Sequence, residues 1–592
     1  MTIIMKTRLI IIISCLVLQH RLFFRAHICY NVGWPILSYV RDGQLGLDVM
    51  GSQTEQKLLP AQVDTVIVGN GPSALILSYI LNGNIPYYNA SHPHPDPILH
   101  QKLLQSPALL NVNVADLTAH FTASRLSYST QALPINVLLD TLIRPLADTH
   151  PGEHRTCVEW RHEETKRVPH VVLGNTAHAG GQWADNPVSA SWDIGTLSYA
   201  EMLSLPGYTF ENHYYRINGR QPPDFHRPTR REVAGYLAIY PNMVNISDSV
   251  FTNVDVSGIS RTIDGFHLAA PNIRCKHLVL ASGIFANLIP PRPLLQPLAA
   301  LHPSTSIRLT PLLIIGSGFT AADIIISTPP GRRIIHIFKW DPDEHPSPLK
   351  ACHPRAYPEY ASVYRQMKLA AKKALNIHDS ATPLRLKKCN PFFAQRNWDN
   401  TYEGFPNTFI KDVAMRDNLA IITLEGSSGR TFDREVSSME YVVGRRGSLR
   451  FLDTEINREV LGVDRQITGN SDMISGRTLR AKAEESLEVA PDVFIIGSLA
   501  GDSLIRFAFG GCIFAAHHIM ERVGQISHQT TTEAGTIKIA NGDITSKPLG
   551  MGIQTHSNNE YIMTNGHSDL GIDRKTRATS TDLEVRKVQV MA

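Results

Sequence analysis

Short apolar runs, each followed by a glycine-rich turn, organise the central part of this chain. Val63–Val68 precedes the first such turn, and Leu312–Ile315 precedes the second. Continuous apolar runs of this length, bounded by turn signals, are typical of buried parallel strands. A helical pattern over Ser73–Leu81 follows the first turn, and a similar pattern follows the second. The chain is therefore predicted to contain two strand–turn–helix units about 250 residues apart.

Other segments extend this α/β pattern. Further strands are predicted at Val171–Leu173, His277–Ala281, Ile334–Phe338, Tyr441–Val443 and Val493–Ile496, the last returning to the first sheet. Amphipathic helices are predicted at Ile135–Ala147 and Arg231–Tyr240.

Both glycine-rich turns match a dinucleotide fingerprint. In this pattern the first glycine permits a tight turn and the second lets the backbone approach a pyrophosphate. A small residue then packs the helix against the strand, and the helix N-terminus holds the phosphates. The matching residues, which we take as candidate cofactor contacts, are Gly69, Gly71, Pro72, Ser73 and Ala74 in the first turn and Gly316, Gly318 and Ala321 in the second. Two matches in this context predict two bound dinucleotides.

The late strand carries a third signal. Val493–Ile496 leads to Leu499-Ala500-Gly501-Asp502, and a helical pattern follows. Flavoproteins with two dinucleotides use such a Gly-Asp to hold the flavin, because the carboxylate accepts a hydrogen bond from a ribityl hydroxyl. Gly501 and Asp502 are therefore predicted FAD contacts. Arg506, one helical turn later, is a catalytic candidate that would stabilise negative charge on reduced flavin or a phosphate; a structural ion pair is the alternative.

Several motifs together resemble the oxidative stress-induced growth inhibitor family, which is related to flavin-containing (class B) monooxygenases. The motifs are the first fingerprint, Pro169–Gly174, Gly180-Gly181-Gln182-Trp183, Leu499–Asp502 with Arg506, Phe507, Gly510 and Gly511, His92–Pro95, and Tyr357–Tyr360. The resemblance covers roughly residues 62 to 523. It implies FAD in the first site, NADPH in the second, and oxygenation of an unidentified small molecule or protein side chain with molecular oxygen. It also implies a role in cell growth and differentiation.

One departure concerns the adenosine ribose of FAD. Related flavoproteins place a carboxylate at the end of the second strand, and counting back from Trp183 that position is Gly174. Asn175, next to it, could bind a ribose hydroxyl instead. Gly181 and Trp183 complete the candidate FAD contacts, with a purely structural core position as the alternative for Trp183.

A 2′-phosphate on the second dinucleotide needs cations near its second strand, Ile334–Phe338. Lys339 stands at the end of that strand and Arg333 just before it, while Asp341 follows closely. The absence of a carboxylate at the strand end itself favours NADPH over NADH.

The resulting fold class is α/β, with two Rossmann-like dinucleotide-binding domains for FAD and NADPH, the second inserted in the first. The predicted segments are an N-terminal extension (1–61), the FAD-binding domain (62–300, with a long insertion at about 89–168), the NADPH-binding domain (301–455), the return to the FAD-binding domain (456–524) and a disordered tail (525–592).

The composition of the chain argues against several classes of function. The net charge of +4 over 592 residues gives no electrostatic case for nucleic acid. Two groups of three arginines, at 227, 230 and 231 and at 445, 446 and 450, are interpreted as solvated faces. Seven cysteines without a C-x-x-C pair argue against a zinc site or dithiol centre and favour a reducing, cytoplasmic compartment. No metal site is predicted. The apolar run Leu9–Leu18 leaves a signal or membrane anchor as an alternative to an unstructured extension.

Three functions remain open from the sequence. The first is an NADPH- and oxygen-dependent flavin monooxygenase. The second is an NADPH oxidase or reductase that releases peroxide. The third is a non-enzymatic regulatory scaffold that retains the nucleotide-binding fold, for which Gly174 is the main support.

Overall fold

The computed structural model describes residues 57–119, 132–145, 155–301, 310–375, 392, 395–426, 428–462 and 473–524. The predicted N-terminal extension up to residue 56 and the predicted tail from 525 lie outside these residues. Among the helices of the described part, none is long and apolar enough to cross a membrane.

A six-stranded sheet contains the first glycine turn. Its order is β20-β21-β9-β1-β4-β5, with bounds Glu488–Ala490, Val493–Ile495, His277–Leu280, Thr65–Val68, His170–Leu173 and Val250–Phe251. β1, β4, β9 and β21 are buried over their whole length, as the apolar runs predict. All neighbours pair in parallel except β20 with β21. The carboxyl ends of five strands therefore meet at one edge.

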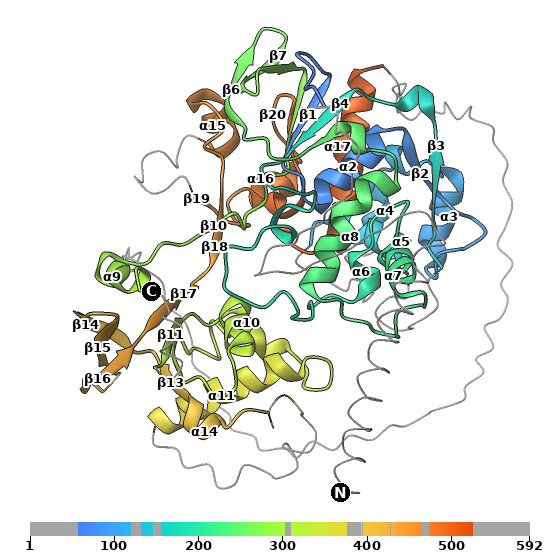
Figure 1. Cartoon of the computed structure of the whole chain (residues 1–592). Helices are drawn as coiled ribbons and strands as arrows, with labels where there is room; N and C mark the ends of the chain where they lie inside the picture. The colour runs from blue at the N-terminus through green and yellow to red at the C-terminus, as the bar shows by residue number, and fades with distance from the viewer. Residues whose placement is uncertain are drawn as a thin grey trace, which may run out of the picture. The chain divides into compact units, whose positions relative to one another are not determined.

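Two helices from opposite ends of the described chain pack beside this sheet. α2 (Pro72–Leu81) follows β1, and α17 (Phe509–Arg522) follows β21; they lie side by side in Figure 1, blue against red. α5 (Pro134–Ile143) packs against α17. A Cβ at Gly510 would lie 2.5 Å from the backbone of Ile135, so glycine permits this close approach.

The segment between α2 and β4 contains a further pair of strands and short helices. β2 (Asn84–Tyr88) pairs with β3 (Val158–His162) in a two-stranded antiparallel sheet. α3 (Pro97–Gln105) and α4 (Val114–Thr118) lie between them in sequence.

After β4 the chain forms three helices around an aromatic core. These are α6 (Ala200–Leu203), α7 (Phe210–Asn218) and α8 (Arg230–Met243). Phe210, Tyr236 and Tyr240 are fully buried, and a capping box of Thr229 and Glu232 begins α8.

A second sheet contains the second glycine turn. Its order is β13-β12-β11-β17, all parallel, with bounds Tyr402–Pro406, Ile334–Phe338, Leu312–Ile315 and Ser438–Tyr441. α10 (Phe319–Ser327) follows β11, and α11 (Pro358–Ala374) packs against α10 and β13. α14 (Trp398–Thr401) precedes β13.

Smaller elements complete the described chain. Antiparallel sheets are formed by β6, β7 and β8 (Ser257–Thr262, Gly265–Ala270, Ile273–Cys275), by β10, β18 and β19 (Asn287–Leu288, Arg445–Ser448, Met473–Ile474), and by β14, β15 and β16 (Phe409–Arg416, Leu419–Glu425, Thr431–Val436). The remaining helices are α9 (Gln296–Ala299), α15 (Thr454–Leu461) and α16 (Arg480–Glu485).

The structure confirms a mixed α/β fold built on parallel sheets, and Val493–Ile495 does join the first sheet. The strand predicted at Tyr441–Val443 is wrong in its bounds. It spans Ser438–Tyr441, because polar Ser438 and Glu440 continue the ladder with β11. The helix predicted at Ile135–Ala147 ends at Ile143. The sheet β14–β16 was not predicted.

Candidate functional site

A cavity of about 420 Å³ lies at the carboxyl edge of the first sheet. The segments that follow β1, β4, β5, β9 and β21 all contribute to its wall. Eight residues predicted to contact FAD line it: Gly69, Gly71, Pro72, Ser73, Asn175, Gly181, Trp183 and Asp502. Two others, Ala74 and Gly501, are not in its wall; Ala74 is fully buried in α2. Parallel sheets bind ligands outside this edge, so the cavity is where the fold predicts a ligand.

The two fingerprint glycines of this site serve different purposes. Gly69 has φ +113, and a Cβ there would lie 2.4 Å from the carbonyl oxygen of Ala281. It is therefore needed for the fold itself. Gly71 has φ −74 as the N-cap of α2, and a Cβ there would meet nothing within 4 Å. It keeps the space in front of the helix N-terminus open for a ligand.

The Gly180-Gly181 loop packs directly onto this fingerprint. The N–H of Gly180 donates to the carbonyl of Asn70 at 2.9 Å. A Cβ on Gly181, which has φ +56, would lie 3.1 Å from the Cα of Gly71. The loop thereby brings Trp183, which is partly exposed, into the cavity wall.

Gly174 ends β4 at the position where related flavoproteins carry a carboxylate. A Cβ on Gly174 would lie 2.1 Å from the side chain of Asn70, which is 2% exposed. The Asn70 amide donates to the Thr176 hydroxyl at 2.9 Å, and that hydroxyl lies 3.1 Å from the Asn70 oxygen. Asn70 therefore fills the volume that a side chain at 174 would need.

A carboxylate does reach the same end of the cavity, from the neighbouring strand. The N–H of Val254 donates to the Gly174 carbonyl at 2.9 Å, and that of Asn253 to the Thr176 carbonyl at 3.0 Å. These bonds hold the segment after β5 against the segment after β4. Asp255, in that segment, is exposed and lines the cavity. The sequence carries no clear signal for this position, because β5 has only two residues.

Asp502 is buried and already bonded within the protein. Its Oδ2 accepts from the N–H of Leu133 at 2.9 Å and from the Asn136 amide at 2.6 Å. Its Oδ1 accepts from Arg480 at 2.9 Å. A carboxylate can accept about four hydrogen bonds, so Asp502 retains capacity for one ligand hydroxyl. Asn136 and Arg480, which fix its orientation, carried no signal in the sequence.

Arg506 lies outside the cavity wall. Its Nε and Nη2 donate to one carboxylate oxygen of Asp140, at 2.9 and 2.6 Å. Both side chains are almost fully buried, at 8% and 2% exposed. The geometry matches the structural ion pair that the sequence left as the alternative to a catalytic role.

The two glycines of the second fingerprint differ in the same way as those of the first. A Cβ on Gly316, at φ +152, would lie 2.5 Å from the carbonyl oxygen of Val442, whereas one on Gly318 would meet nothing within 4 Å. Gly318 is the N-cap of α10, and Ala321 is buried in its first turn. The open space again lies before a helix N-terminus.

His336, which the sequence analysis did not consider, holds this turn in place. Its Nε2 donates to the Gly316 carbonyl at 2.7 Å, and its Nδ1 accepts from the Tyr402 hydroxyl at 2.8 Å. Burial lowers the pKa of His336 to about 4, so the ring is neutral near pH 7. A histidine inside an apolar strand was the available signal.

The two cations predicted for the 2′-phosphate are not brought together. Lys339 is exposed at the carboxyl end of β12, level with the fingerprint. Arg333 precedes Ile334, which pairs with Leu312 at the start of β11, so it lies at the opposite edge of the sheet. Five residues of strand span roughly 16 Å. Arg333 is therefore removed from the candidate site, and Lys339 remains.

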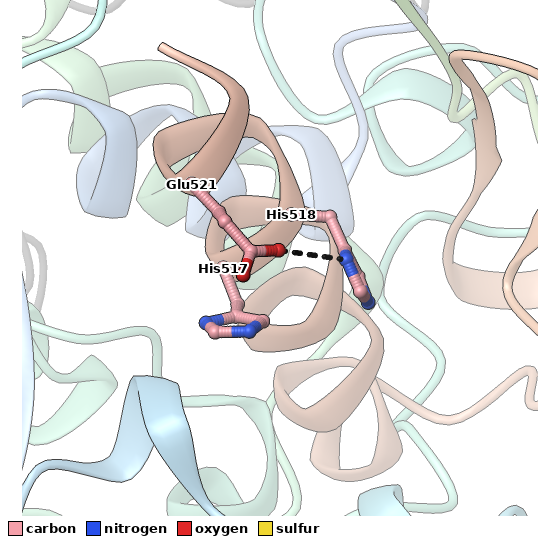
Figure 2. A group of neighbouring side chains, drawn as sticks. All are labelled: His517, His518 and Glu521. Carbon is pink, nitrogen blue, oxygen red and sulfur yellow. Dashed lines mark ion pairs between the residues drawn. The ribbon is translucent and has the colours of Figure 1, made fainter. Parts of the chain in front are cut away.

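Within the described residues, two groups of three side chains could hold a metal ion. One group, Asp341, Glu344 and His345, is largely exposed. The other is on α17, where Figure 2 shows Glu521 directed toward His518, with His517 beside them. His518 and Glu521 form an ion pair at 3.7 Å, and the His518 ring lies 4.4 Å from that of Phe514. These contacts account for the positions of both side chains, and we assign no ion to either group.

The fold and site define an α/β protein with a glycine-lined cavity at the edge of a parallel sheet. No family model matches the chain. Oxidative stress-induced growth inhibitor 1 from Mus musculus is 26% identical over 514 residues, covering 80% of this chain and 98% of its own. Oxidative stress-induced growth inhibitor 2 from Homo sapiens is 25% identical over 505 residues, covering 76% and 91%. The resemblance predicted from the sequence is thus confirmed.

Solved structures similar to this chain include a flavin-containing monooxygenase and an ornithine hydroxylase. A flavin-containing monooxygenase from Stenotrophomonas maltophilia has a TM-score of 0.42 at 14% identity, covering 78% of this chain and 99% of its own. An ornithine hydroxylase from Pseudomonas aeruginosa has a TM-score of 0.41 at 14% identity, covering 78% and 100%.

Proposed function

We propose that this protein is an FAD-dependent, NADPH-using monooxygenase that acts in the regulation of cell growth and differentiation. The observation that carries the proposal is the cavity at the edge of the first sheet, where eight residues chosen from sequence for FAD lie together. A second open helix N-terminus, at Gly318, supports a second dinucleotide. The names of the curated relatives support the growth-related role.

The residues of the cavity fit a flavin dinucleotide. Gly71 and the N-terminus of α2 offer an open cradle with free N–H groups and a positive dipole end for the pyrophosphate. Within the described residues, neither lysine nor arginine lines this cavity, so the helix end would be the main source of positive potential. Asp502 would bind a ribityl hydroxyl, and the segment containing Ala508, just before α17, would face the ring system.

The adenosine end would use a carboxylate in an unusual place. Asn70 occupies the volume beside Gly174, so the second strand itself offers no acidic side chain. Asp255 and Asn175 would bind the ribose hydroxyls from the two adjacent strand ends. Among the described residues the Asp255 carboxylate makes no hydrogen bond or ion pair, so it is available to a ligand. This arrangement weakens the case for a scaffold without cofactor.

Bound FAD would supply the chemistry, by accepting hydride from NADPH and activating oxygen. The protein would bind and orient both dinucleotides. Trp183 and the apolar residues near Ile505 would shield the flavin from water. Arg506 is proposed as a positioning residue, because its guanidinium already forms an ion pair with Asp140.

Flavin analysis of purified protein tests the proposal. Yellow protein that releases FAD on denaturation, and that NADPH bleaches without oxygen, is expected. Rapid mixing of the reduced protein with oxygen then separates the two enzymatic candidates. A monooxygenase should show a transient absorbance distinct from both oxidised and reduced flavin, whereas an oxidase should reoxidise in one phase with stoichiometric peroxide. Correctly folded protein that binds neither FAD nor NADPH would leave only the scaffold.

A further inference from the structure

Two arginines from separate basic clusters come together beside the second fingerprint. We propose that Arg230 and Arg445 bind the diphosphate of the nicotinamide dinucleotide. This inference rests on the proposed function, since it names the groups that would hold NADPH between the two sites. From the sequence alone, both clusters were interpreted as solvated faces.

Arg445 lies at the ligand-binding edge of the second sheet. β12 lies on one side of β11 and β17 on the other, so the strand order reverses between β11 and β17. Open α/β sheets bind ligands at such a reversal. Val442, just after β17, donates to the carbonyl of Ile315 at 2.9 Å and continues the ladder to the fingerprint. Arg445 follows three residues later, at the start of β18.

Arg230 reaches the same place from the first nucleotide site. It is the first residue of α8, and its Nη2 donates to the carbonyls of Gln182 and Asp185. The Arg445 Nη2 donates to the side-chain oxygen of Asn186 at 2.6 Å. Both guanidinium groups thus bind one short loop, part of which lines the cavity proposed for FAD. The guanidinium carbon of Arg230 lies 5.0 Å from the centre of the Trp192 ring, a cation–π contact that holds the side chain in place.

The charge of this pair is poorly compensated by the protein. Within the described residues, neither arginine forms an ion pair with a carboxylate, and the Nε of each is buried without a hydrogen-bond partner. The carboxylates of Asp323 in α10 and of Asp185 attract both arginines, but neither lies within ion-pair distance of them. Burial, and then the charge of Arg445, lower the pKa of Arg230 to about 10. Two desolvated like charges are costly unless an anion joins them.

A diphosphate suits this arrangement better than other anions. It carries two negative charges side by side, and planar guanidinium groups bind phosphate oxygens in pairs. A dinucleotide whose diphosphate lay here would have the fingerprint on one side and the flavin cavity on the other. Its nicotinamide half could then extend toward the flavin, while its 2′-phosphate lay toward Lys339.

Dissociation constants for NADPH and NADH, measured with the FAD-loaded protein, test the inference. Arg230→Met and Arg445→Met should each raise both constants roughly ten- to hundredfold, and by the same factor, because the diphosphate is common to both cofactors. Arg231→Met is the matched control. It is adjacent in α8 but exposed and paired with Asp193 at 2.9 Å, so neither constant should change. Inorganic pyrophosphate should compete with NADPH on the wild-type protein.

The outcomes that would overturn the inference about the two arginines differ from the outcome that would refute the proposed function. Wild-type affinities in both methionine variants would show that the pair has only a structural role. A loss confined to NADPH would place the 2′-phosphate there instead. Arg445→Lys, which keeps the charge, should retain part of the affinity; if it binds no better than Arg445→Met while melting at the same temperature and holding the same FAD, the charge argument fails. Wild-type protein that binds FAD but no dinucleotide would refute the proposed function itself.

Discussion

Gly71 and Gly318 allow each proposed cofactor site to be blocked separately without unfolding the protein, because an added Cβ at either position meets nothing within 4 Å. In Gly71→Val the backbone at φ −74 and ψ 178 already suits a β-branched residue, and the new Cβ meets nothing within 4 Å. Replacing glycine at an N-cap by an apolar residue costs up to about 1 kcal/mol of stability. The isopropyl group, however, would occupy the space in front of α2 that a pyrophosphate needs.

The expected loss of cofactor follows from that overlap. Forcing extra methyl groups into a filled site costs about 1 to 3 kcal/mol, and 1.4 kcal/mol corresponds to a tenfold change in binding. Gly71→Val should therefore weaken FAD roughly ten- to hundredfold. The assay is the FAD-to-protein ratio after purification, followed by titration of apoprotein with FAD monitored by flavin fluorescence.

Gly318→Val provides the matched control, because it is the same substitution at the N-cap of α10, with equally open space. It should retain FAD and lose affinity for NADPH. Full flavin occupancy in Gly71→Val, with unfolding unchanged in both proteins, would refute the assignment of the first cavity. Equal loss of FAD in both variants would show that the effect is one of stability.

Three further predictions follow from single contacts. Lys339→Glu should weaken NADPH at least roughly tenfold and NADH little in binding titrations, because it opposes the 2′-phosphate; equal losses would exclude that contact. Arg506→Met should lower the free energy of unfolding in urea by about 1.5 to 3 kcal/mol, since it removes both hydrogen bonds that Arg506 donates to the buried Asp140 and leaves that carboxylate with Arg144, 3.6 Å away. A stable, flavin-loaded Arg506→Met that only turns over slowly would instead support the catalytic role. Burial lowers the pKa of His170 to about 4 from an unfolded value near 6.5, so this side chain should contribute about 3 kcal/mol to the stability lost as the pH drops from 6.5 to 4, in addition to the contribution of His336. Replacing His170 with Gln should flatten that part of the stability profile, and an unchanged slope would contradict the assignment.

The local patterns of the chain identified the strands that support the site. A side chain at Gly69 or Gly316 would collide with the backbone of a neighbouring segment. Each glycine belongs to a short local motif, so it could be recognised from the sequence. Contacts between distant segments were not predictable. Asn136 and Asp502 are 366 residues apart, as are Asp140 and Arg506, and no periodicity connects them.

The misplaced Arg333 and the unpredicted strand β15 have different physical explanations. Arg333 and Lys339 flank the same strand, and proximity in sequence concealed that they lie at opposite edges of the sheet. β15 alternates buried and half-buried residues, a pattern typical of a sheet with one covered face. The same alternation is visible in the sequence of Leu419–Glu425, so this strand was predictable.

The position of β21 beside β9 has a consequence for biosynthesis. About 210 residues separate Leu280 from Val493, so β1, β4 and β9 leave the ribosome well before the strand that covers the edge of β9. At 5–20 residues per second this interval lasts roughly 10 to 40 s. During translation the backbone groups along the edge of β9, and the face of α2 that later meets α17, lack their final partners. Nascent chains of this length are therefore expected to recruit chaperones, and the wall of the first cavity is complete only after Asp502 and Ala508, which line it, have been synthesised.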